Sequence, residues 1–238
     1  MKPDGVLFDA AGTLFDLVPP IHAVIASSAA RHGHQCAPDH VERALGHVGG
    51  TLGWPDDEPD SAGRMRAWTV FARRIIGEAG LHAPEATLQQ IAEQAAATIL
   101  EPANYQAFPD AVPLIERLAA AGIRIGIVSN FDDLLFDILD CTGLGALFET
   151  VLTSYRTGIS KPDPRIFHLA ARAIRAEPAA TYYIGDSVYS DMGGAHAAGL
   201  HGVLIDRDGK HSAYSGAKIV SLMDLQLDLD RQQAPHQK

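Results

Sequence analysis

The stretch that decides the fold is Val6-Leu7-Phe8-Asp9-Ala10-Ala11-Gly12-Thr13-Leu14. Its apolar beginning predicts a short buried strand over residues 4–9, and Gly12 allows the backbone to turn closely after it. The strand therefore brings one carboxylate, Asp9, to its carboxyl end. An Asp in such a position can act as a covalent nucleophile. Two residues later, where a second carboxylate would complete an acid/base pair, the chain has Ala11.

Beyond Phe108, helical and strand-like segments alternate along the chain. We expect helices over residues 111–121, 133–141, 164–174 and 191–198, and strands over residues 123–128, 150–153, 182–184 and 203–205. Repeated units of this length predict an α/β, Rossmann-like fold, in which helices cover both faces of a parallel sheet. Sites in such folds lie at the carboxyl ends of the strands.

The span between the first strand and Phe108 has a different character. It is rich in Ala, has apolar residues at helical spacing and contains no convincing strand pattern. We expect four helices in it, near residues 20–33, 39–45, 64–80 and 84–100. The sequence therefore predicts a four-helix domain over residues 17–104, inserted into a core formed by residues 1–16 and 105–238.

Composition argues against two classes of partner. The chain has 238 residues, a formal net charge of −10 and no basic block, so we expect no nucleic-acid partner. No apolar stretch is long enough to span a bilayer, so we expect no membrane partner. Residues 1–4 lead into the first strand without an apolar leader, and Cys36 and Cys141 have neither disulfide nor metal spacing. A cytoplasmic location is therefore expected.

Polar residues of distinctive chemistry follow the predicted strands. They are Asp9, the pair Ser129 and Asn130, Lys161 in a Ser-Lys-Pro sequence, and Asp186 with Asp191. If the sheet is parallel, these groups meet at one edge. Together they offer a nucleophile, a hydroxyl donor, a cation and two further carboxylates. Carboxylate oxygens of this kind suit Mg²⁺, which prefers one or two carboxylates together with water and substrate phosphate.

The same residues, in this order, resemble the four motifs of the haloacid dehalogenase-like (HAD) hydrolase superfamily. The opening stretch resembles the first motif, Ile127-Val128-Ser129-Asn130 the second, Lys161-Pro162-Asp163 the third, and Gly185-Asp186-Ser187-Val188-Tyr189-Ser190-Asp191 the fourth. Four motifs in order, each after a strand, are a strong signal. The resemblance extends over essentially the whole chain, and the helical insert resembles the cap of many family members.

The resemblance implies catalytic roles for three residues. Asp9 would attack phosphorus and form an aspartyl-phosphate, Lys161 would neutralise charge on the nucleophile and the phosphate, and Ser129 would hold phosphoryl oxygens together with the Asn130 amide. The residues implied to bind substrate are Gly12, Thr13, Ser129, Asn130 and Lys161. The implied substrate is a small phosphate ester or acyl phosphate, and positioning with charge stabilisation would supply most of the rate.

The resemblance also implies a Mg²⁺ cofactor. The residues implied to hold it are Asp9, Ala11 through its backbone carbonyl, Asp186, and Asp191 directly or through water. Asp186 and Asp191 are the metal pair of the fourth motif, and both are present in this chain.

The departure from the family pattern is Ala11. Family phosphatases usually have Asp there, which protonates the leaving group and later activates water, and losing such a group costs about 10²–10⁴-fold in rate. A slow or selective phosphatase is our first expectation. One alternative is a haloacid dehalogenase, because those relatives also lack this carboxylate, although they work without metal and are not expected to keep Gly-Asp in the fourth motif. Another is a non-catalytic binding protein. Asp16 is a candidate replacement acid, although a hinge or capping role is favoured.

Overall fold

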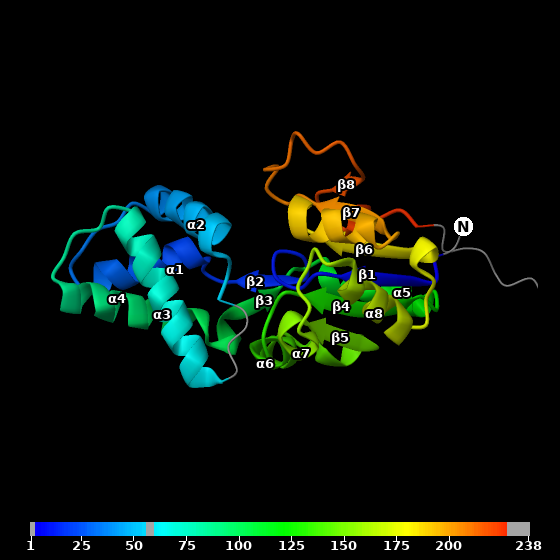
Figure 1. Cartoon of the computed structure of the whole chain (residues 1–238), viewed down its shortest axis with the longest axis horizontal. Coiled ribbons are helices and arrows are strands. Elements are labelled where there is room, and N and C mark those ends of the chain that lie inside the picture. Colours follow the sequence, from blue (N-terminus) through cyan, green and yellow to red (C-terminus); the bar gives the residue numbers. More distant parts are fainter. Residues whose placement is uncertain (1–2, 56–59, 228–238) are drawn as a thin grey trace, which may run out of the picture. The chain divides into compact units, whose positions relative to one another are not determined.

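The computed structural model describes residues 3–55 and 60–227, and Figure 1 shows the course of the chain. The chain divides into two compact units. One, called here the core unit, consists of Met1–Phe15, Ala107–Asn130 and Gly143–Lys238. The other, the helical unit, consists of Asp16–Gln106 and Phe131–Thr142.

The core unit is built on a six-stranded sheet of strand order β5-β4-β1-β6-β7-β8, in which every neighbouring pair is parallel. The strands are β1 (Gly5–Phe8), β4 (Arg124–Ser129), β5 (Thr150–Thr153), β6 (Thr181–Gly185), β7 (His201–Ile205) and β8 (Lys218–Ile219). The predicted α/β fold with a parallel sheet is therefore confirmed. β8, a strand of two residues, was not expected.

Helices connect these strands, as the sequence predicts. They are α5 (Ala111–Ala120), α7 (Ser154–Thr157), α8 (Pro164–Ala173), α9 (Gly194–Ala197) and a π-helical segment, Val188–Gly193. The amphipathic helix α8 buries Ile166, Phe167 and Ala170 in a core that also contains Leu7 and Tyr183. The helix expected at 191–198 begins three residues earlier and in π form, because the Met192 N–H reaches back to the Ser187 carbonyl.

The helical unit contains four helices at the places expected from the sequence, although the second, expected over residues 39–45, continues to Leu52. They are α1 (Ile21–Arg31), α2 (Pro38–Leu52), α3 (Ser61–Glu78) and α4 (Glu85–Ile99), and the unit also includes α6 (Leu134–Cys141). Two short strands, β2 (Phe15–Leu17) and β3 (Tyr105–Ala107), pair with each other. The expectation of no strand within residues 17–104 is therefore wrong by one residue, since β2 extends to Leu17.

Residues 131–142, which the sequence analysis assigns to the core, group with the helical unit. Asp132 explains part of this grouping. Its carboxylate accepts a hydrogen bond from the Leu134 N–H at 2.8 Å and lies 3.6 Å from the Arg64 guanidinium of α3. Helix α6 is thus tied to the helical unit near its first turn.

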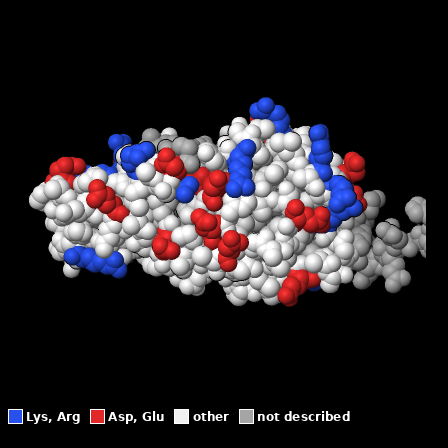
Figure 2. Space-filling view, turned by 90° about the horizontal axis from the view of Figure 1, so that it is seen from below, with Lys and Arg blue, Asp and Glu red and all other residues white. Residues whose placement is uncertain are grey.

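Charges of both signs lie on the surface. Figure 2 shows Lys and Arg side chains interspersed with Asp and Glu side chains on the face that it draws. Within residues 3–55 and 60–227, no helix has the length and apolar character needed to cross a membrane.

Candidate active site

The carboxyl ends of three adjacent strands lie at the same level. β1 lies between β4 and β6, with Phe8 opposite Ile127 on one side and Ile184 on the other. Asp9 directly follows β1, and its N–H donates to the Ile184 carbonyl at 2.8 Å. Because β4 ends at Ser129 and Asp186 follows β6, the parallel register brings polar residues from three strands to one edge of the sheet.

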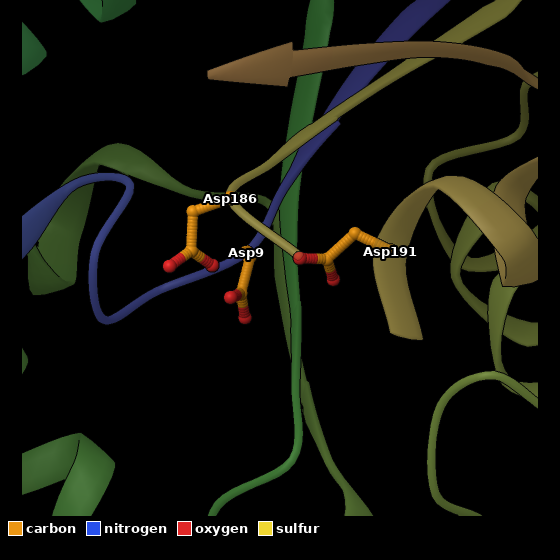
Figure 3. Close-up of side chains that lie close together, drawn as sticks. All are labelled: Asp9, Asp186 and Asp191. Atoms are coloured by element: carbon orange, nitrogen blue, oxygen red, sulfur yellow. The ribbon is translucent and has the colours of Figure 1, made fainter. Parts of the chain in front are cut away.

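Three carboxylates meet at this edge, as Figure 3 shows: Asp9, Asp186 and Asp191 each have an oxygen within 4.8 Å of the others. Asp191 belongs to the π-helical segment and is fully buried. It fits because Gly185 has no side chain, since a β-carbon there would lie 2.5 Å from Oδ2 of Asp191. The same oxygen, Oδ2 of Asp191, accepts a hydrogen bond from the N–H of Ser187 at 2.9 Å.

Lys161 places its ammonium between two of these carboxylates. Nζ donates to Oδ1 of Asp9 at 2.7 Å and to Oδ1 of Asp191 at 2.6 Å, and the side chain is 3% exposed. A third contact, of 3.0 Å, joins Nζ to the hydroxyl of Tyr183. An ammonium has three N–H groups, so all three of them have acceptors within the protein.

Tyr183 is a site residue that the sequence reasoning missed. Its hydroxyl lies 3.0 Å from Lys161 Nζ, 3.1 Å from Oδ1 of Asp191 and 2.9 Å from the backbone carbonyl of Val128. The sequence offers one signal for it. A Tyr inside a strand buried on both faces needs a partner for its hydroxyl, and Tyr183 lies three residues before Asp186.

The electrostatics of the cluster are those of crowded, buried acids. Burial raises the pKa of Asp9, and the charge of Asp191 adds to this, although Lys161 opposes both effects. Burial also raises the pKa of Asp186, and the charges of Asp9 and Asp191 raise it further. For Lys161, burial alone would lower the pKa, but the charges of Asp191 and Asp9 raise it above its ordinary value overall. Lys161 is therefore a cation.

The residues expected to bind phosphate lie near this edge, with differences in detail. Ser129 is buried at the end of β4. The side chain of Asn130 contacts the backbone of Lys161, donating to its carbonyl at 3.0 Å and accepting from its N–H at 2.7 Å. Thr13 is fully buried, and its hydroxyl has no hydrogen-bond partner among the described residues. Asn130 thus orients Lys161, while the Thr13 hydroxyl faces the protein interior.

A second group of contacts, partly buried and also missed from the sequence, supports the loop after Asp9. Arg207 donates to both carboxylate oxygens of Asp110, at 2.9 and 3.0 Å, and to the backbone carbonyl of Thr13 at 2.9 Å. Its guanidinium carbon lies 3.8 Å from the centre of the Phe108 ring. Asp110 also accepts from the Ser221 hydroxyl at 2.7 Å. Arg207 thereby fixes the backbone of the loop that contains Ala11 and Gly12.

The donor set fits Mg²⁺. Three carboxylates with oxygens within 4.8 Å of one another supply the hard oxygen ligands that this ion prefers. Lys161 bonds to Asp9 and Asp191, whereas Asp186 makes no ion pair with any described residue. A divalent cation beside Asp186 would supply that missing positive charge. The Ala11 backbone, half-buried in the turn after Asp9, lies in the same loop.

A pocket of about 380 Å³ lies elsewhere, in the helical unit. Its lining includes Trp54, Val70 and Phe71, together with Arg66. None of its lining residues belongs to the carboxylate cluster, so we do not assign the chemistry to it.

Comparison with known proteins agrees with this geometry. Residues 3–199 match the family model described as haloacid dehalogenase-like hydrolase. The human haloacid dehalogenase-like hydrolase domain-containing protein 3 is 30% identical over 201 residues, covering 83% of this chain and 80% of that protein. A phosphoserine phosphatase of Thermus thermophilus is 30% identical over 166 residues, covering 69% of this chain and 66% of that protein.

Among solved structures, a HAD phosphatase from Thermococcus onnurineus superposes with a TM-score of 0.62 at 26% identity. The match covers 94% of this chain and 95% of that one. With a family model matching most of its length and the expected motifs gathered at one sheet edge, the chain belongs to the haloacid dehalogenase-like hydrolases.

Proposed function

We propose that this hydrolase is a magnesium-dependent phosphatase that acts on a small phosphorylated metabolite through Asp9. The observation that carries the proposal is the arrangement of charges around Asp9. One of its oxygens is held by Lys161, and Asp186, a carboxylate without an ion-pair partner among the described residues, lies beside it. The similarity to the phosphoserine phosphatase of Thermus thermophilus supports the same reaction class.

In the proposed reaction, Asp9 uses the oxygen not held by Lys161 to attack phosphorus. The bond from phosphorus to the leaving oxygen breaks, and an aspartyl-phosphate forms on Asp9. Ser129 and the backbone N–H of Asn130 bind the phosphoryl oxygens, with Gly12 and Thr13 contributing the backbone of the loop. Lys161 favours the ionised form of Asp9. It offsets the phosphate charge through its own charge, because its N–H groups are already bonded within the protein.

Asp9, Asp186 and the carbonyl of Ala11 would hold Mg²⁺, with Asp191 reaching it directly or through water. When bound, the ion supplies positive charge to the phosphate oxygens. Asp191 has less freedom to act as a ligand than Asp186, since its oxygens already accept from Lys161 and from the Ser187 N–H.

Ala11 shapes the expected selectivity. No side chain at this position can protonate a leaving oxygen, so substrates whose leaving groups depart unprotonated are favoured. Acyl phosphates and aryl phosphates meet this requirement. We also propose that residues 17–104 act as the cap domain of this family and select the substrate.

The test is hydrolysis of an aryl phosphate and an acyl phosphate, with Mg²⁺ and with a chelator. We expect Mg²⁺-dependent phosphate release, its loss in Asp9→Asn, and a gain of one phosphoryl group on the intact protein during turnover. Asp163→Asn, on a carboxylate that bonds to the neighbouring Arg165, is the matched control. Absence of phosphate release from every substrate would reject the proposal.

Ala11 also favours one other reaction. A halide leaves without a proton, so Asp9 attacking the carbon of a 2-haloacid needs no acid at position 11. Halide release that continues in the presence of chelator would assign the chain to dehalogenation instead. If neither phosphate nor halide is released while Mg²⁺ or a phosphate analogue still binds, the chain is a binding protein.

A further inference from the structure

The hydroxyl of Tyr183 is the point at which three parts of the site meet. It contacts Lys161 at 3.0 Å, the carboxylate of Asp191 at 3.1 Å and the backbone carbonyl of Val128 at 2.9 Å. Val128 precedes Ser129 in β4, so the hydroxyl joins the strand of the second motif to the lysine of the third and the second carboxylate of the fourth. The side chain is fully buried.

The partners of this hydroxyl determine whether it donates or accepts toward Lys161. Lys161 can only donate, so the Tyr183 oxygen accepts from it. The single hydroxyl hydrogen then has two acceptors within reach, the Val128 carbonyl at 2.9 Å and the carboxylate of Asp191 at 3.1 Å. The remaining two N–H groups of Lys161 go to Asp9 and Asp191. The direction of the ammonium is therefore fixed by three acceptors, of which Tyr183 is the only uncharged one.

We propose that Tyr183 is a positioning residue that aims the ammonium of Lys161 at Asp9. Without the hydroxyl, the ammonium of Lys161 keeps its hydrogen bonds to Asp9 and Asp191 but loses the third contact that fixes its direction. The Val128 carbonyl loses its contact with the hydroxyl at the same time. The expected effect on the reaction rate rests on the proposed function, because Lys161 would influence the rate through Asp9 as the nucleophile.

The packing of the ring separates this role from a structural one. Tyr183 packs edge-on against Phe167, with ring centres 4.8 Å apart and planes at 71°. Tyr183→Phe keeps this contact and removes only the hydroxyl. The neighbouring Tyr182 provides the matched control. It is half-buried, its ring lies against His201 at 5.0 Å, and successive residues of a strand point to opposite faces.

The first experiment reads Lys161 directly and needs no substrate. In the full-length protein labelled with ¹⁵N-lysine, NMR measures hydrogen exchange at the ammonium of Lys161, identified by its absence in Lys161→Arg. The other described lysines, Lys210 and Lys218, are exposed. We expect slow exchange at Lys161 in the wild type, exchange faster by about 10-fold or more in Tyr183→Phe, and no change in Tyr182→Phe.

Equal exchange rates at Lys161 in the wild type and a folded Tyr183→Phe would overturn the proposal. In the wild type, hydrogen exchange at Lys161 that is as fast as exchange at Lys210 would also overturn the proposal. This comparison uses the wild-type protein alone, so it does not depend on whether a variant folds.

The second experiment measures kcat and KM on an aryl phosphate. Misaligned catalytic groups cost about 10–100-fold in rate, so we expect kcat of Tyr183→Phe to fall by this factor with KM unchanged. A fall in melting temperature with unchanged kcat would identify a structural role and overturn the proposal. If the wild type releases no phosphate, the proposed function fails, while the exchange measurement still decides the role of Tyr183.

Discussion

Gly12 packs against the side chain of Asp186. A β-carbon added at Gly12 would lie 2.9 Å from Cγ of Asp186 and would overlap one of its carboxylate oxygens. Gly12 also has a φ of +75°, which L side chains rarely adopt. The glycine therefore has two functions: it allows the turn after Asp9, and it leaves room for the carboxylate that follows β6.

Gly12→Ala is expected to displace Asp186 and so weaken Mg²⁺ binding. The matched control is Gly199→Ala, because Gly199 has a φ of +76° and no neighbouring atom within 4 Å of an added β-carbon. Both variants carry the backbone strain of about 1–2 kcal/mol, measured as a loss of melting temperature. Only Gly12→Ala is expected to lose Mg²⁺ affinity in calorimetry. Equal affinities in the two variants would show that Asp186 does not need its present position.

Asp186→Asn tests the metal site more directly. The substitution keeps the shape of the side chain and removes the charge, so we expect Mg²⁺ affinity to fall by at least about 10-fold with the fold retained. Asp163→Asn, whose carboxylate bonds to Arg165, controls for the loss of one negative charge. Calorimetry that gives the same affinity for the wild type and Asp186→Asn would exclude Asp186 as a ligand.

The fold could be predicted from the sequence because its strands are buried on both faces and alternate with amphipathic helices. Features that depend on only a few residues could not be predicted from the sequence. β8 has two residues, Lys218 and Ile219, which is too short for any periodicity. The π-helical segment is marked by the bond from the Met192 N–H to the Ser187 carbonyl five residues earlier, a contact that the spacing of apolar residues does not predict. The grouping of residues 131–142 depends on the contact between Asp132 and Arg64, which are distant in sequence.

The site shows the same division. Asp9, Lys161, Asp186 and Asp191 follow strands in the sequence, and the structure brings their side chains together. Tyr183 and Arg207 were missed because each has the sequence pattern of something ordinary. Tyr183 fits the pattern of a core aromatic residue, and Arg207 fits that of a polar residue after a strand. Their importance comes from partners that are 55 and 194 residues away, Val128 and Thr13.

The pair Asp110 and Arg207 should make stability depend on pH. Burial tends to raise the pKa of Asp110, but hydrogen bonds from Arg207, Ser221 and Leu222 hold it below its ordinary value. A depressed pKa means that the folded state favours the ionised form. This contribution is therefore fully present above the ordinary Asp pKa, about pH 4, and is lost as the pH falls through the lowered value.

We expect Asp110→Asn to lower the free energy of unfolding by about 1–3 kcal/mol at neutral pH, with a difference from the wild type that shrinks below about pH 4. Denaturant unfolding at several pH values measures this difference. Asp208→Asn removes a carboxylate from an exposed pair with Lys210 and should have little effect. A difference that does not change with pH would show that the charge of Asp110 is not what stabilises the fold.

Restoring a carboxylate at position 11 tests the proposed chemistry as a whole. With Ala11, no side chain at this position can protonate a leaving oxygen or activate water, so the aspartyl-phosphate on Asp9 should persist. Ala11→Asp is expected to accelerate dephosphorylation of Asp9 by about 10²-fold or more. Ala11→Asn has nearly the same size but cannot exchange a proton, so it separates the chemical effect from a steric one. Single-turnover kinetics on one aryl phosphate compare the three forms.

The restored acid should also change which substrates are accepted. Alkyl phosphates, whose leaving groups need a proton, should gain more from Ala11→Asp than aryl phosphates, whose leaving groups do not. The ratio of the two rates is therefore a sharper measure than either rate alone, because a general disturbance of the site changes both in the same direction. The contradicting result is an unchanged ratio, with dephosphorylation equal to or slower than in the wild type. It would mean that another residue already performs the acid/base step or that phosphoryl transfer is not the reaction of this protein. In the first case, Asp16 is the first residue to test.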